Sequence, residues 1–87
     1  MKHFEDLWVE SEEYTKLYYN DPVNLVIEKV KIQLDSLINC NDQNKKIEII
    51  GKILLDISFI SQKLNIDVYS ALKKEIEELK IELFDPE

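Results

Sequence analysis

Apolar side chains recur every three or four residues along most of the chain, and this spacing constrains the fold more than any other feature. An α-helix has 3.6 residues per turn, so the spacing collects these side chains on one face of a helix. The 87 residues include one glycine and two prolines, which is little material for the turns of a sheet protein. The sequence therefore predicts an all-α fold, a bundle of four helical segments in one domain over residues 1–87.

The proline and polar residues between the apolar stretches predict where the helices begin and end. Four helices are expected, at about residues 2–19, 22–38, 45–64 and 68–84. Pro22 suits the first turn of the second helix, with Asp21 as its N-cap. The polar residues 39–44 predict the clearest loop, and Asp67 is the expected N-cap of the fourth helix.

The third predicted helix is apolar on most sides, which indicates a central or sandwiched position. Gly51 lies inside it, where a glycine costs about 1 kcal/mol relative to alanine and so suggests a close contact with another helix. Glu48, Lys52 and Asp56 are four residues apart and are expected to pair along the remaining polar strip. If Asp56 is buried it needs a partner, either Lys52 or a residue across the bundle.

Two apolar stripes stand out as candidate interfaces. The fourth predicted helix carries a coiled-coil-like seam of about two heptads. The first predicted helix holds the only tryptophan and an aromatic stripe, which is typical of a core or a protein interface and less often of a stacking platform for a nucleotide. The expected dimer or partner interface consists of Trp8, Tyr14, Tyr18, Tyr69, Leu72, Ile76, Leu79 and Leu83.

The net charge of −7 is concentrated at the two ends of the chain. Residues 1–22 carry six acids against two lysines, and residues 77–87 carry five acids against one. Such ends repel nucleic acid and anionic membranes, so a protein with a basic or apolar surface is the expected partner. No apolar run approaches the roughly 20 residues of a membrane span. The single Cys40 and the lack of a signal peptide predict a cytoplasmic protein.

The sequence lacks the residue combinations that most catalytic sites require. One histidine (His3) and one cysteine do not make a zinc site, and all 11 basic residues are lysines, which lack the bidentate phosphate contact of arginine. Neighbouring carboxylates could hold Mg²⁺, but an acidic helix face is usually solvated surface. No catalytic residue, metal or other cofactor is therefore expected.

The run from Glu48 to Asp67 resembles the third helix of the MazG-like all-α nucleotide pyrophosphohydrolases, in which Glu-Glu-hydrophobic-Gly-Asp precedes a long apolar stretch and Leu-Gly-Ile-Asp. Their activity requires four acids that hold Mg²⁺. At the matching positions of the third helix this chain has Ile49 and Lys52, which are not acids. The second helix offers either Lys29 and Ile32 or Glu28 and Lys31. The resemblance therefore implies a catalytically dead relative, a pseudoenzyme that forms a helical dimer.

Three functions follow as hypotheses. The first is a non-enzymatic, acidic interaction protein, an inhibitor or adaptor that forms a homodimer. The second is a divergent Mg²⁺-dependent nucleoside triphosphate pyrophosphohydrolase, whose metal would be held by Glu28, Glu48 and Asp56 or by the acidic face that Glu75, Glu78 and Glu82 form. The third is a protein that binds or sequesters a nucleotide through its aromatic side chains and lysines.

Overall fold

The computed structural model describes residues 3–84, which form four α-helices and no strand. The helices are α1 (Phe4–Tyr18), α2 (Val23–Ile38), α3 (Gln43–Lys63) and α4 (Val68–Phe84). The all-α prediction with four helices is confirmed. Pro22 ends the link between α1 and α2 in an extended conformation, so α2 begins one residue later, at Val23.

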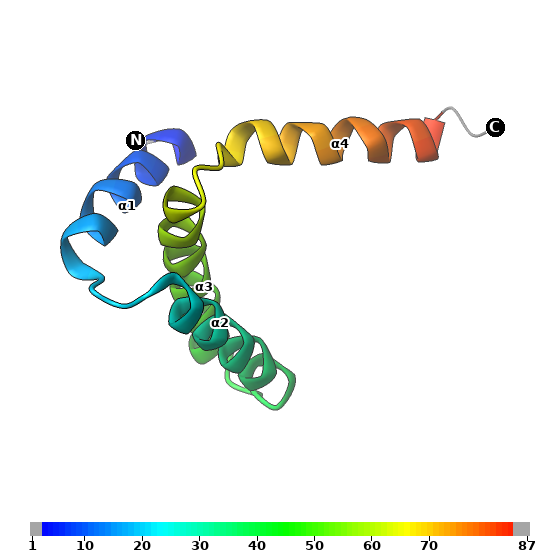
Figure 1. Ribbon diagram of the computed structural model, residues 1–87. Helices are drawn as coiled ribbons and strands as arrows, with labels where there is room; N and C mark the ends of the chain where they lie inside the picture. Colours follow the sequence, from blue (N-terminus) through cyan, green and yellow to red (C-terminus); the bar gives the residue numbers. More distant parts are fainter. Residues whose placement is uncertain (1–2, 85–87) are drawn as a thin grey trace.

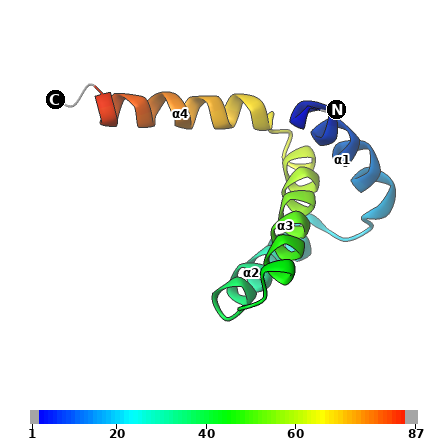
Figure 2. The ribbon, with the colours of Figure 1, turned by 180° about the vertical axis from the view of Figure 1, so that it is seen from behind.

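Helix α3 is the centre of the molecule (Figure 1). Helix α2 lies beside it along its first half, and α1 packs against its second half. Helix α4 leaves the end of α3 at a sharp angle and runs away from the other three helices, as both views show (Figure 2). The predicted central position of the third helix is therefore confirmed, whereas the fourth helix does not join the bundle.

Side-chain caps fix the starts of α3 and α4. The Asp42 carboxylate accepts a hydrogen bond of 3.0 Å from the Asn44 backbone N–H. Asp67 accepts from the Tyr69 backbone N–H at 3.2 Å and from the Ser70 hydroxyl at 2.7 Å, as its predicted capping role requires. The cap predicted at Asp21 is wrong: Pro22 occupies the N-cap position of α2 and no side chain caps this helix.

A bend at Asn65 separates α3 from α4. Asn65 has a φ of 60°, in the left-handed region that asparagine tolerates better than most residues. The Ile66 backbone N–H reaches back to the Ser61 carbonyl at 2.8 Å, which closes the end of α3. This closure directs the chain away from α3, so α4 projects from the bundle.

The hydrophobic core of a single copy is small. Val26, Ile53 and Phe59 are the buried apolar side chains of the described residues, at 1%, 7% and 2% exposure. Many more large apolar side chains are exposed, on all four helices. One copy therefore leaves uncovered most of the apolar surface that the sequence pattern predicted would be packed.

The close helix contact predicted at Gly51 is absent. Gly51 is exposed, and a Cβ atom built on it would have no atom within 4 Å among those of neighbouring helices and side chains. The side-chain hydrogen bonds between α1 and α3 join Ser11 to Ser58 and Thr15 to Gln62, which lie further along α3 than Gly51.

No helix among residues 3–84 combines the length and the hydropathy that crossing a bilayer requires.

Candidate functional site

A buried carboxylate joins three parts of the fold. The Asp56 side chain on α3 has no exposed surface. Its Oδ1 accepts a hydrogen bond from the hydroxyl of Tyr19, the C-cap residue that follows α1. Its Oδ2 accepts from Nε2 of Gln33 on α2 at 2.6 Å. The Lys29 ammonium lies 3.7 Å from Oδ1 and supplies the opposite charge that a buried carboxylate needs.

Tyr19 lies between this carboxylate and the hydrophobic core. Its ring centroid is 4.8 Å from that of Phe59, and the Lys29 ammonium is 5.4 Å from the Tyr19 ring centroid. Burial raises the pKa of the Tyr19 hydroxyl well above its usual value of about 10, and the hydrogen bond to Asp56 and the negative charge of Asp56 add to the effect. The Tyr19 hydroxyl is therefore protonated at neutral pH, as its hydrogen bond to Asp56 requires.

The predicted polar strip of α3 divides into two parts. Lys52 and Glu48 form an exposed pair at 3.9 Å, as their spacing predicted. Asp56 instead points inward, and its cationic partner is Lys29 across the helix pair. The sequence pattern did not predict that Tyr19, Lys29 and Gln33 contact Asp56. The one available sign was the four-residue spacing of Lys29 and Gln33, which places these two polar side chains on the same face of α2.

Hydroxyl and amide groups also line the contact between α1 and α3. The Ser11 and Ser58 hydroxyls are hydrogen-bonded at 2.8 Å. Nε2 of Gln62 donates to Thr15 Oγ1 at 3.0 Å and to the Ser58 carbonyl at 3.1 Å. Thr15 and Ser58 are buried, so this polar contact determines how α1 sits on α3.

The three acids proposed for a metal site do not converge. Glu28 is exposed on α2 and pairs with Lys31 at 3.0 Å. Glu48 is exposed on α3, between Lys45 at 3.6 Å and Lys52 at 3.9 Å. Asp56 points into the helix pair, where its oxygens are already occupied. Across residues 3–84, no group of three or more histidine, cysteine, aspartate or glutamate side chains could hold a metal ion.

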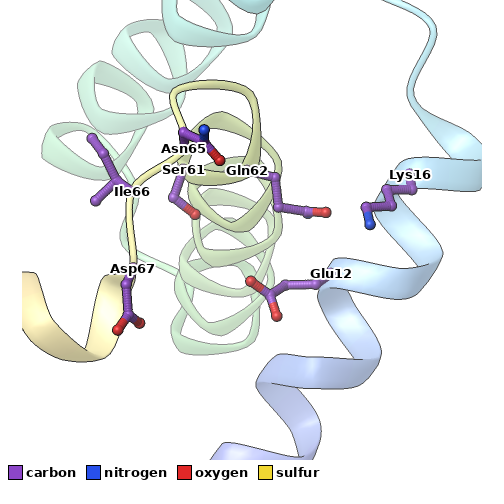
Figure 3. Close-up of a pocket in the computed structure, with 7 residues that line it drawn as sticks. All are labelled: Glu12, Lys16, Ser61, Gln62, Asn65, Ile66 and Asp67. Atoms are coloured by element: carbon purple, nitrogen blue, oxygen red, sulfur yellow. The ribbon is translucent and has the colours of Figure 1, made fainter.

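A polar pocket of about 460 Å³ lies where α1 passes the junction of α3 and α4 (Figure 3). In Figure 3, Glu12 and Lys16 reach from α1 toward the last turn of α3, and Asp67 stands at the start of α4. Both Asp67 oxygens already accept the capping hydrogen bonds of α4. The lining residues are Glu12, Lys16, Ser61, Gln62, Asn65, Ile66 and Asp67.

A second, more apolar hollow of about 720 Å³ opens between the end of α1 and helices α2 and α3. Aromatic and aliphatic side chains form most of its walls, and the two lysines Lys29 and Lys52 add positive charge. Its lining residues are Tyr14, Thr15, Leu17, Tyr18, Tyr19, Lys29, Lys52 and Leu55.

The side chains predicted to form an interface are accessible. Trp8 is partly covered and stacks on Phe4 with 5.8 Å between ring centroids. The other members are exposed: Tyr14, Tyr18, Tyr69, Leu72, Ile76, Leu79 and Leu83. His3 is also exposed, and Cys40 is a free thiol in the α2–α3 loop. The structure therefore leaves the apolar side chains of the predicted interface accessible, and the oxygens of its buried carboxylate accept hydrogen bonds from within the fold.

Among known proteins, no family model, no curated sequence and no solved structure matches this chain.

Proposed function

We propose that this protein is a non-enzymatic interaction protein that forms a homodimer and binds another protein as an inhibitor or adaptor. The observation that carries the proposal is the uncovered apolar surface. A single copy buries the side chains of Val26, Ile53 and Phe59 but leaves large apolar residues exposed along every helix. Apolar surface of this extent on a soluble chain marks a site of protein association.

The chemistry of the described acids supports a binding role. Glu28 and Glu48 are engaged by surface lysines, and Asp56 is held by Tyr19, Gln33 and Lys29. These contacts give each acid a structural partner. A partner protein with a basic or apolar surface suits the net charge of −7, and a single free cysteine fits a reducing compartment such as the cytoplasm.

We also propose a distant relationship to the MazG-like pyrophosphohydrolases, with loss of their activity. Its support is the run from Glu48 to Asp67, together with Ile49 and Lys52 at positions where that family has acids. On this proposal the helical dimer was retained and the metal site was lost.

Two measurements on the full chain test the proposal. Light scattering coupled to gel filtration should give twice the 10.3 kDa mass of one chain at micromolar concentration. Incubation with nucleoside triphosphates and Mg²⁺ or Mn²⁺ should release no monophosphate or pyrophosphate above the level of buffer. A monomeric mass would contradict self-association, and metal-dependent hydrolysis would contradict the non-enzymatic role.

The hollow at the end of α1 favours a second candidate function, the binding of a nucleotide. Tyr14 and Tyr18 offer ring faces for stacking on a base, and Lys52 offers positive charge for a phosphate. A thermal-shift screen against nucleotides tests this function. Stabilisation that disappears in the Lys52→Ala variant would support it, and a flat response to all nucleotides would exclude it.

A further inference from the structure

Helix α4 presents an unpartnered apolar seam. The seam side chains are between 43% and 65% exposed, and no residue of α4 is buried. The helix stands clear of α1, α2 and α3, so a second helix has access along its length (Figures 1 and 2). The seam occupies positions a and d of a heptad repeat, with Tyr69, Ile76 and Leu83 at a and Leu72 and Leu79 at d.

The two flanks of this seam carry opposite charges. In a coiled coil, positions e and g border the seam on its two sides and form ion pairs between helices. On α4 one flank is basic, with Lys73 and Lys80 at e, and the other is acidic, with Glu75 and Glu82 at g. The segregated charges give α4 a directional pattern as well as an apolar face.

We propose that α4 pairs with α4 of a second copy as a parallel, in-register two-stranded coiled coil. This inference rests on the proposed self-association. It specifies the surface through which the two copies associate and the relative direction of the two helices. In a parallel pair, g of one helix faces e of the next heptad of the other, so Glu75 of each copy meets Lys80 of its partner. The symmetry of the dimer forms this attractive pair twice.

The antiparallel alternative places like charges together. There the g flanks face each other and the e flanks face each other, which brings Glu75 near a second Glu75 and the lysines near lysines. Among parallel coiled coils, β-branched Ile76 at a and leucines at both d positions favour two strands over three or four, whereas Tyr69 and Leu83 occupy the other a positions. The charges therefore select the parallel direction.

Charge reversal in the full chain tests whether the two α4 helices run parallel. Glu75→Lys and Lys80→Glu should each weaken the dimer roughly tenfold, since two attractive pairs become repulsive. The double variant restores opposite charges and should return the dissociation constant to that of the unmodified chain. In an antiparallel dimer like charges face each other before and after either change, so neither variant would weaken it.

Two controls isolate the contact between helices. Lys74→Glu and Glu78→Lys change the net charge by the same amounts at positions f and c, away from the seam, and should leave the dimer intact. Lys80 also pairs with Glu77 of its own helix at 3.9 Å. The double variant loses that contact too, so recovery in the double variant is due to the charges between copies.

A cysteine at Leu83 gives a second test of direction. In a Cys40→Ser background, Leu83→Cys should form a disulfide-linked dimer in a glutathione buffer, whereas Lys74→Cys on the outer face should not. In an antiparallel pair centred between Leu72 and Ile76, the two cysteines would lie about 27 Å apart along the axis, too far to bridge. A dimer that neither cross-links at residue 83 nor responds to charge reversal overturns the parallel arrangement alone. A monomer, with α4 left for a helix of another protein, overturns the self-association as well.

Discussion

The side-chain amide of Gln33 donates a hydrogen bond of 2.6 Å to Oδ2 of Asp56 and thereby ties α2 to the middle of α3. The other oxygen of the same carboxylate holds Tyr19 at the end of α1. Three segments of the fold thus meet at Asp56, and few buried apolar side chains are available to hold these segments together. The stability of the fold should depend strongly on this residue.

Asp56→Ala should destabilise the protein by about 2–4 kcal/mol, because it leaves the buried donors of Tyr19 and Gln33 without an acceptor. Urea unfolding followed by circular dichroism measures the loss. Asp35→Ala, at an exposed position on α2, is the matched control and should change stability by less than about 0.5 kcal/mol. Equal effects of the two substitutions would contradict the structural role of Asp56.

Alkaline pH should destabilise the fold through Tyr19. Its folded-state pKa is raised above the unfolded value of about 10, so its contribution to stability is complete below about pH 10. Above that pH the unfolded chain ionises more readily than the folded chain, and stability falls. Tyr19→Phe should lower stability at neutral pH and flatten the decline above pH 10, as urea midpoints across pH 8–11 would measure. The exposed Tyr14→Phe controls for loss of a tyrosine hydroxyl, and an unchanged decline in Tyr19→Phe would be inconsistent with this role.

Gly51→Ala should stabilise the protein by about 0.5–1 kcal/mol, because alanine favours the helix and a Cβ at this position meets no neighbour within 4 Å. Thermal unfolding measures the gain. A loss of stability would instead show that another copy packs against Gly51 in the assembled protein, which would be the close helix contact that a glycine within a helix predicts.

The spacing of apolar residues was sufficient to predict the helices, because each apolar stripe and each break is a local property of the sequence. The Asp67 cap was predictable for the same reason. The partners of Asp56 were not, since Tyr19 and Gln33 lie 37 and 23 residues away and the helix packing decides which of them meet. The projection of α4 was also not predicted. The apolar seam of α4 predicts a contact with another helix but does not say which one. The bend at Asn65 directs α4 away from α1, α2 and α3, so none of these three helices covers the seam.

Substitution in the seam should separate assembly from folding. Ile76→Lys places a charge in the middle of the a/d stripe and should convert the dimer to monomer while the helical circular dichroism of α1–α3 persists. Ile81→Lys, on the outer face of α4, is the control, because Ile81 is also exposed but lies outside the seam. Equal masses for the two variants would contradict a specific role for the seam.

The molar mass of the unmodified chain in solution tests the central claim most directly. Sedimentation equilibrium over a range of micromolar concentrations should show a monomer–dimer equilibrium that approaches twice 10.3 kDa. A mass of 10.3 kDa at every concentration would contradict the account, because the apolar surface of α4 would then remain uncovered in solution.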